Sequence, residues 1–256
     1  MTDNIKNKWF IAIKPNNGDI FNTNDLYQIP SPIGRYYADP FLFKKDNKNY
    51  LFFEEKDSGK GIISCCEIDE NNQMSSPRTV LDLPHHLSFP CVFQDGDNIY
   101  MVPETGDAGT IDIFKSIEFP YKWEHCKNII SNARAADPII FKHNEVWFLM
   151  TTVVAGKSMD IPGIDLEVVG MDDGVLIAYS DDLLGNWQIH PICKDNFPFH
   201  SPDSRLAGNV FKYKDKLIKP VQKRDPLTAK YGHSIAFKEI IISKTEYKES
   251  YIDKKI

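Results

Sequence analysis

Four acidic side chains hold related places in a pattern that the chain repeats. Asp39 and Asp137 each precede a proline in the matching stretches ADPFLF and ADPIIF, and Glu55 and Glu104 lie at the ends of apolar runs. Carboxylates that share a low-dielectric cavity push each other's pKa values apart, which divides acid and base roles between similar groups. Paired carboxylates suit glycosyl chemistry. The catalytic candidates are therefore Asp39, Asp137 and Glu104.

The two Asp-Pro pairs also have a structural explanation. Proline lacks an N–H and biases the preceding residue toward extended backbone, so Asp-Pro suits the first residues of a strand. For Asp39 alone the two explanations have equal weight. The functional one gains weight if Asp39, Asp137, Glu55 and Glu104 share one rim, because clustered carboxylates are typical of functional sites.

Each acidic position belongs to a repeated hairpin pattern. Short apolar runs ending in Phe, followed by a polar turn and a second apolar run, cover residues 39–55, 89–105, 137–152 and 207–222. β-Branched and aromatic residues around turn formers such as KDNKN and DGDN indicate tight β-hairpins. The hairpins recur at intervals of about 50 residues, which is typical of propeller blades, and residues 155–174 form an insertion that lengthens the third interval.

A second pair of strand-like segments after each hairpin completes a blade. The four predicted blades cover residues 39–83, 88–131, 136–193 and 205–250. Segments within residues 8–30 resemble the outer strands of a further blade, but no fifth inner hairpin follows blade four. We predict one all-β domain over residues 1–256, a five-bladed β-propeller whose fifth blade lacks its inner hairpin, as expected of a shortened chain. Trp123 and Trp187 open predicted outermost strands, where an indole packs between blades.

The hairpin geometry predicts which side chains share one end of the central channel. The first strand of a blade begins, and the second ends, at the same face, because the two strands are antiparallel. The predicted strand starts at this mouth are Asp39, Ser88, Asp137 and Arg205. The predicted ligand-binding residues there are Glu54, Glu55, Arg205, Gln222, Tyr231 and His233.

Other polar residues near the mouth leave alternatives open. Arg205 either neutralises the carboxylates as an ion-pair partner or binds an anionic group on a ligand. His85 and His86 either overhang the mouth or are solvated loop residues. Acidic residues of the 155–174 insertion either form a lid or coordinate a cation, although their spacing matches no EF-hand.

Composition excludes several classes of protein. The net charge is −6 and the lysines are scattered, which argues against a nucleic-acid or anionic-membrane partner. The five cysteines have no metal-ligand spacing, and no apolar run reaches the length of a membrane span or a signal peptide. Phosphate-loop, HExxH and GxSxG motifs are also absent. We expect a cytoplasmic protein with no cofactor, no metal and no membrane span.

Longer combined motifs resemble a known family. The stretches GRYYADPFLF, LSFPCVF, AADPIIF, YSDDLLGNWQIHP, SRLAGNVF and YGHSIAFKEI are similar to the N-terminal domain of glucosamine inositolphosphorylceramide transferases and its bacterial relatives. The resemblance extends from Trp9 to Glu249. It implies a five-bladed propeller similar to glycoside hydrolase families 43, 32 and 117.

The resemblance also implies roles for some residues. In family 43 hydrolases a blade-one Asp is the general base, a blade-three Asp orients the acid, and a blade-four Glu is the acid. Asp39 and Asp137 match the first two by blade position, whereas the blade-four stretch SRLAGN carries Arg205 and no Glu. In the plant transferases, sugar transfer is assigned to a separate C-terminal glycosyltransferase domain, which implies a glycosyltransferase partner for this chain.

Two hypotheses follow from the sequence. In the first, the chain is a glycoside hydrolase-like enzyme with Asp39 as base, Asp137 as orienting carboxylate and Glu104 as acid. In the second, it is a carbohydrate-binding or accessory module that holds a sugar or glycolipid headgroup at the channel mouth. We favour the second, because the blade-four acid and the fifth inner hairpin are missing.

Overall fold

The computed structural model describes residues 10–14, 26–132, 134–153, 174–195, 199–200, 203–223 and 234–252. Regular structure in these residues is almost entirely antiparallel β-sheet, with one short helix, α1 (Pro191–Asp195). Tyr231 and His233 lie outside the described residues, as does the 155–174 insertion apart from Gly174. No helix in the described part of the chain is long and apolar enough to cross a membrane.

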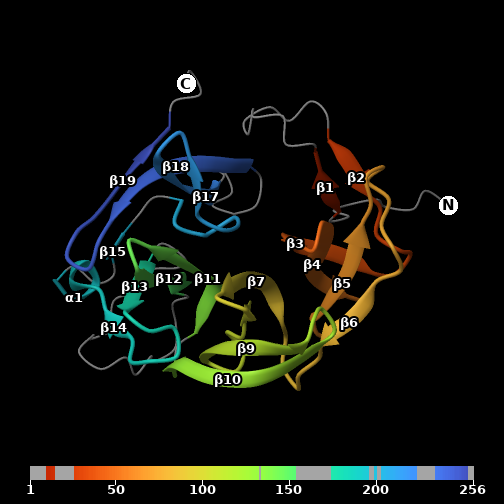
Figure 1. Cartoon of the computed structure of the whole chain (residues 1–256), viewed down its shortest axis with the longest axis horizontal. Coiled ribbons are helices and arrows are strands. Elements are labelled where there is room, and N and C mark those ends of the chain that lie inside the picture. Colours follow the sequence, from red (N-terminus) through yellow and green to blue (C-terminus); the bar gives the residue numbers. More distant parts are fainter. Residues whose placement is uncertain are drawn as a thin grey trace.

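Four sheets form the blades of a β-propeller around a common centre (Figure 1). Blade one contains β3 (Tyr36–Lys45), β4 (Lys48–Lys56), β5 (Ile62–Ile68) and β6 (Arg78–Leu81). Blade two contains β7 (Ser88–Asp95), β8 (Asn98–Glu104), β9 (Thr110–Glu118) and β10 (Lys122–Ser131). Blade three contains β11 (Ala135–His143), β12 (Val146–Val153), β13 (Gly174–Ser180) and β14 (Gln188–Ile189), with β15 (Phe199–His200) also paired to β13. Blade four contains β16 (Phe211–Tyr213), β17 (Lys216–Lys223), β18 (Ser234–Ile242) and β19 (Tyr247–Tyr251).

Local turn chemistry explains the four inner hairpins that the sequence predicts. In the β3–β4 turn, Asp46 and Asn47 have φ angles of 49° and 60°. In the β11–β12 turn, Asn144 and Glu145 have φ angles of 47° and 60°. Two successive residues with positive φ match the right-handed twist of the flanking strands, and Asn and Asp tolerate this conformation. The polar turn residues therefore fix both hairpins.

Aromatic side chains fill the space between blades. Phe52 of blade one is fully buried, and its ring centroid lies 5.9 Å from that of Trp123 in the outermost strand of blade two. The indole N–H of Trp123 donates a hydrogen bond to the carbonyl of Pro120 at 2.8 Å. Trp187, just before β14, donates similarly to Leu183 at 3.0 Å. Both tryptophans are packing residues, as predicted.

A separate two-stranded sheet packs on blade one. The strands β1 (Ile11–Ile13) and β2 (Tyr27–Ile29) pair antiparallel, which confirms both strand segments predicted near the N-terminus. Ile11 and Ile29 are buried in a small apolar cluster with Phe53 and its neighbours on β4. Phe53 points to the opposite side of β4 from Phe52 because successive residues of a strand alternate. The small sheet therefore covers the face of blade one that blade two does not.

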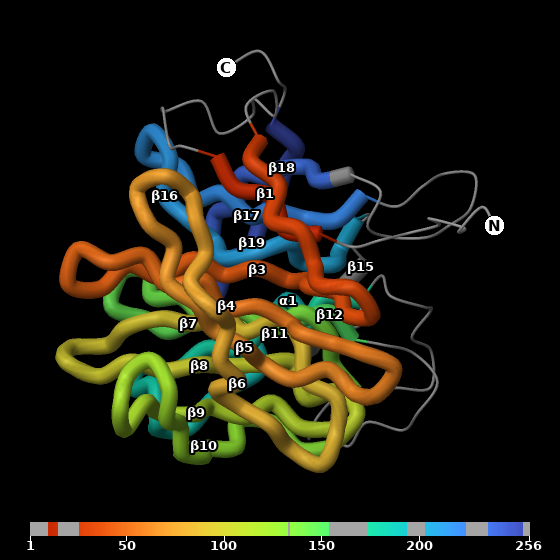
Figure 2. Tube along the Cα trace, turned by 90° about the vertical axis from the view of Figure 1, so that its right-hand side faces the viewer, coloured from red at the N-terminus to blue at the C-terminus, as the bar shows by residue number. Residues whose placement is uncertain are grey.

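The ends of the inner hairpins define the two sides of the propeller. Figure 2 shows the tight turns of the β3–β4 and β7–β8 hairpins projecting on one side. The beginnings of β3, β7 and β11 and the ends of β4, β8 and β12 lie at the other side, because each pair is antiparallel. This second side is the mouth that the sequence predicts.

Candidate functional site

Three β-bulges place the residues that line the mouth. Asp39, Phe89 and Asp137 have φ angles of 49°, 47° and 53°, and each precedes a proline. At each place the register shifts, so that two residues of the inner strand face one residue of its partner. A bulge accommodates a proline that cannot donate to the ladder and redirects the neighbouring side chain. A left-handed non-glycine residue costs about 1–3 kcal/mol, which surrounding contacts must offset.

The bulges correct two sequence-based expectations. Asp39 and Asp137 are not the extended first residues of their strands, because β3 begins at Tyr36 and β11 at Ala135. Blade two also has Phe89, not Ser88, at the equivalent place. Ser88 pairs with Glu104 in the register in which Ala38 pairs with Glu54.

Carboxylates from one blade bind the bulge amides of the next. The backbone N–H of Phe89 in blade two donates a hydrogen bond to Asp39 of blade one. The N–H of Asp137 in blade three donates to Glu104 Oε2 of blade two at 2.9 Å. A buried amide that a bulge has removed from the strand ladder needs such an acceptor. Asp39 and Glu104 therefore join neighbouring blades at the mouth.

Asp137 is held by blade four. The Nε of Arg205 lies 2.6 Å from Asp137 Oδ2, and Nη2 lies 2.9 Å from Oδ1, which is a bidentate ion pair. The amide of Gln222 donates to Asp137 Oδ2 at 3.4 Å and to the Leu206 carbonyl at 2.9 Å. The side chain of Asp137 is only 3% exposed. Of the two roles predicted for Arg205, the structure shows the ion-pair partner.

The remaining carboxyl groups have raised pKa values. Burial, reinforced by the negative charge of Asp137, raises the pKa of Asp39 to about 7. Burial and the same charge raise the pKa of Glu104 to about 8. In each case Arg205 opposes the shift without cancelling it. Both carboxyl groups are thus held near the boundary between acid and carboxylate at neutral pH.

Glu54 extends the cluster toward the gap between blades one and two. Burial and the charge of Asp39 raise the pKa of Glu54 to about 7. The hydroxyl of Tyr36 donates to Glu54 Oε1 at 3.5 Å, and the Nε2 atom of His86 lies 3.4 Å from the same oxygen. The His86 ring is fixed in turn, because its Nδ1 accepts the backbone N–H of Gly61 at 2.8 Å. His86 therefore belongs to the site.

Comparison with known sequences assigns the family. A family model described as "Glucosamine inositolphosphorylceramide transferase 1, N-terminal" matches residues 12–256. The chain belongs to this family. Glucosamine inositolphosphorylceramide transferase 1 of Arabidopsis thaliana is 30% identical over 221 residues, which are 84% of this chain and 27% of that protein. The protein of the same name from Oryza sativa subsp. indica is 27% identical over the same shares. This chain thus spans about a quarter of the length of the curated relatives it matches.

Solved structures similar to this family member are glycoside hydrolase propellers. An exo-1,5-α-L-arabinanase from a bovine ruminal metagenomic library has a TM-score of 0.61 and 9% identity, covering 88% of this chain and 86% of that one. An exo-β-1,3-galactanase from Phanerochaete chrysosporium with β-1,3-galactotriose has a TM-score of 0.61 and 15% identity, covering 84% and 51%. A thermostable family-43 glycoside hydrolase has a TM-score of 0.59 and 12% identity, covering 83% and 74%. At these identities the likeness establishes the fold alone.

One predicted site residue of this family member lies elsewhere. Glu55 follows Glu54 on β4 and therefore points to the opposite face of blade one. There it forms an ion pair with Arg35 and accepts a hydrogen bond from the Ser64 hydroxyl at 2.6 Å. Glu55 is therefore part of the face that adjoins β1 and β2, and not of the carboxylate cluster.

Tyr36 is absent from the predicted site residues, and the sequence leaves two interpretations of His86 open. Tyr36 stands three residues before Asp39 in the stretch GRYYADP, so its place on the same strand was a usable signal. His86 had no comparable signal, because its contact to Glu54 depends on how the β6–β7 connection crosses the turn between β4 and β5. Among the described residues, no group of three His, Cys, Asp or Glu side chains is arranged to hold a metal ion.

Proposed function

We propose that this chain binds a sugar or glycolipid headgroup at the propeller mouth, as a carbohydrate-binding or accessory module. The observation that carries the proposal is the bidentate pair of Arg205 with Asp137. Asp137 is buried and both of its carboxylate oxygens accept hydrogen bonds from Arg205, which disfavours a direct role in catalysis. The blade-four position supplies a permanent cation, because a guanidinium does not release a proton in proteins.

The other groups at the mouth suit sugar hydroxyls. Asp39, Glu54 and Glu104 have pKa values near neutrality, so each can accept a hydrogen bond as a carboxylate or donate one as an acid. A sugar hydroxyl also both donates and accepts. The Tyr36 ring, half-buried at the start of β3, adds an apolar surface beside them.

The names of the relatives indicate the ligand class. The plant relatives are named glucosamine inositolphosphorylceramide transferase 1, and the name of one structural neighbour includes β-1,3-galactotriose. For this chain we infer a ligand that contains a hexose or inositol ring. Because the relatives are much longer, we also infer that the module acts beside a glycosyltransferase.

A second candidate function is a glycoside hydrolase-like enzyme. The observation that favours it is the pair of raised pKa values at Asp39 and Glu104, since glycosidases need one carboxyl group protonated and one ionised. In this alternative Asp39 is the base, Glu104 the acid and Asp137 the orienting carboxylate.

Binding and turnover assays separate the two functions. We would titrate the protein calorimetrically with glucosamine, myo-inositol and a panel of oligosaccharides, and assay aryl glycosides for hydrolysis. We expect saturable binding without turnover, and Asp39→Asn should weaken binding about tenfold. The control Asp46→Asn alters an exposed hairpin turn at the far side and should change nothing. Turnover that Asp39→Asn abolishes would establish the enzyme instead, and no binding to any sugar would reject the proposal.

We further propose that β1 and β2 are the outer strands of a fifth, incomplete blade. Their sheet packs on blade one at the face opposite blade two, which is where the last blade of a closed propeller would lie. A structure of one of the longer plant relatives tests this. The strand matching β1 should pair with an inner hairpin there; a β1 edge that pairs with no such hairpin would contradict the fifth blade.

A further inference from the structure

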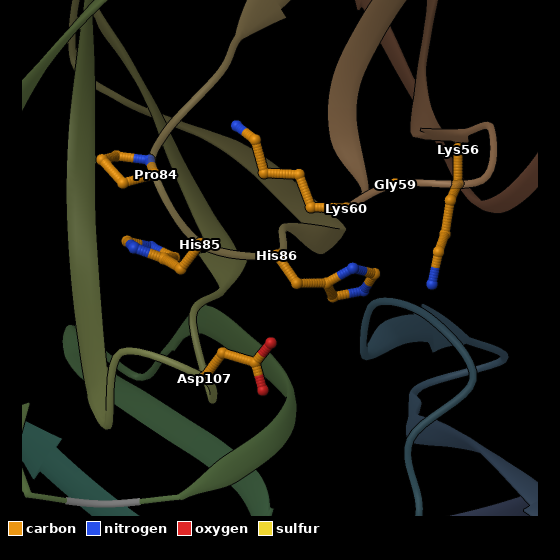
Figure 3. Close-up of a pocket in the computed structure, with 7 residues that line it drawn as sticks. All are labelled: Lys56, Gly59, Lys60, Pro84, His85, His86 and Asp107. Carbon is orange, nitrogen blue, oxygen red and sulfur yellow. The ribbon is translucent and has the colours of Figure 1, made fainter.

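A hollow lies between blades one and two, next to His86, the neighbour of Glu54. It has a volume of about 520 Å³ and is lined by Lys56 at the end of β4, Gly59 and Lys60 from the β4–β5 turn, residues 84–86 from the β6–β7 connection, and Asp107 from the β8–β9 turn. These connections all lie at the mouth side of the propeller, where β4 and β8 end and β7 begins. Figure 3 shows the seven lining residues. A volume of this size is enough for a small ligand group. We call it the Lys56 pocket.

The charges of the Lys56 pocket differ from those of the mouth. Lys60 is engaged with the Asp82 carboxylate and the Leu83 carbonyl, so its charge is already compensated. Lys56 forms no ion pair with any residue that the structure describes, and its nearest aromatic contact is the Tyr36 ring, with the centroid 6.0 Å from Nζ. Figure 3 shows the Lys56 ammonium and the His86 ring on the same side of the hollow. The charge of Lys56 acts on Glu54, where it opposes the rise in pKa, but no described ion pair holds the Lys56 ammonium in place.

His86 connects this pocket to the mouth. Because its Nδ1 accepts the Gly61 N–H, the neutral ring carries its proton on Nε2, 3.4 Å from Glu54 Oε1. Burial and the charge of Lys56 lower the pKa of His86, which keeps the ring neutral at pH 7. His86 thus contacts Glu54 of the mouth and lines the pocket together with Lys56.

We propose that the Lys56 pocket is an anion subsite that takes a phosphate ester group on the ligand whose ring occupies the mouth. The inference rests on the proposed function of the mouth. A phosphate oxygen would accept hydrogen bonds from the Lys56 ammonium, which binds phosphate as a point charge. Asp39, Glu54 and Glu104 line the mouth and repel an anionic substituent when they are ionised, and the Arg205 guanidinium there is already engaged by Asp137, whereas Lys56 attracts such a substituent.

Asp107 offers a second variant, whose expected effect on anion binding is opposite to that of Lys56→Gln. Its carboxylate stands on the pocket wall and bears the same sign of charge as a phosphate group. If the pocket takes an anion, Asp107→Asn should strengthen binding and Lys56→Gln should weaken it. If the pocket takes a neutral group, neither variant should change the affinity. If it takes a cation, Asp107→Asn should weaken binding and Lys56→Gln should strengthen it. The matched control is Lys44→Gln, an exposed lysine of β3 near the opposite end of the hairpin.

The test compares inorganic phosphate, myo-inositol, myo-inositol 1-phosphate and glycerophosphoinositol by titration calorimetry. We expect the phosphate esters to bind at least tenfold more tightly than myo-inositol, and Lys56→Gln to remove that advantage. Asp107→Asn should raise phosphate-ester affinity severalfold, and Lys44→Gln should have no effect. The monoester and the diester distinguish a terminal phosphate from a bridging one. In NMR spectra the His86 ring resonances should shift on phosphate binding in the wild type, which provides a readout independent of the variants.

The outcomes separate this inference from the proposed function. Equal affinity for myo-inositol and its phosphate esters would overturn the anion subsite and leave sugar binding at the mouth intact. Binding of inorganic phosphate that depends on Lys56, without any binding of neutral rings, would support the subsite and reject the mouth. Affinity for phosphate that Lys56→Gln leaves unchanged would overturn the subsite as well.

Discussion

Arg205 compensates the negative charge of buried Asp137, because its guanidinium donates one hydrogen bond to each carboxylate oxygen. Removing one partner of a buried pair leaves an uncompensated charge, which costs about 3–5 kcal/mol. We therefore expect Arg205→Met to lower the free energy of unfolding by about 3 kcal/mol in urea titrations. Arg205→Lys should cost less, since it keeps the charge but loses the fork geometry. The exposed Arg134→Met should stay within about 0.5 kcal/mol of the wild type; an equal loss in both would contradict this account.

The raised pKa of Asp39 makes the free energy of unfolding depend on pH. Because the folded state raises this pKa from 3.8 to about 7, it holds the proton more tightly than the unfolded chain. The contribution of Asp39 to stability is therefore present below pH 4 and is lost as the pH rises toward 7. Asp39→Asn removes the ionisation, so its stability relative to the wild type should improve between pH 5 and pH 8.

The difference in stability between Asp39→Asn and the wild type should therefore depend on pH. We expect the relative gain of Asp39→Asn to be on the order of 2 kcal/mol, measured by urea unfolding at both pH values. Asp46→Asn, in an exposed turn, should give the same difference from the wild type at pH 5 and pH 8. A pH-independent difference for Asp39→Asn would show that the carboxyl group is not desolvated as described.

At the scale of elements, the turn between β4 and β5 must carry a glycine where it meets His86. A Cβ atom on Gly61 would overlap the Leu87 carbonyl oxygen and would lie 2.7 Å from both Glu54 Oε1 and His86 Cε1. We expect Gly61→Ala to destabilise the protein by about 1–3 kcal/mol, the usual cost of overpacking. The control is Gly59→Ala, whose Cβ would meet only the Asp57 side chain at 3.2 Å. Thermal melting of both variants measures the effect, and a neutral Gly61→Ala would refute the contact.

The same elements show why hairpins were predictable and bulges were not. The β3–β4 hairpin follows from a local pattern, because Asp46 and Asn47 suit the turn that the flanking apolar runs require. The left-handed conformation of Asp39 contradicts the local preference of a residue before proline. It arises from pairing across the sheet and between blades, where Asp39 accepts the Phe89 amide. Such a non-local contact cannot be predicted from the stretch ADPFLF alone.

At the scale of the whole molecule, the site exists because four blades bring together residues that are distant in sequence. The repeat period was sufficient to predict the propeller and to place Asp39, Glu104 and Asp137 at one mouth. The period could not distinguish Glu54 from Glu55, since alternation requires one of them to face away and only the register tells which. Nor could it predict that Arg205 would occupy both oxygens of Asp137, because that pair joins blades three and four.

The most direct measurement is a crystal structure of the protein with the sugar or inositol phosphate that binds most tightly in titration. The account predicts a ring at the mouth whose hydroxyls contact Asp39 and Glu104, with the Arg205–Asp137 pair unbroken beneath it. A ligand seated on the outer strands, or one that displaces Arg205 from Asp137, would contradict it.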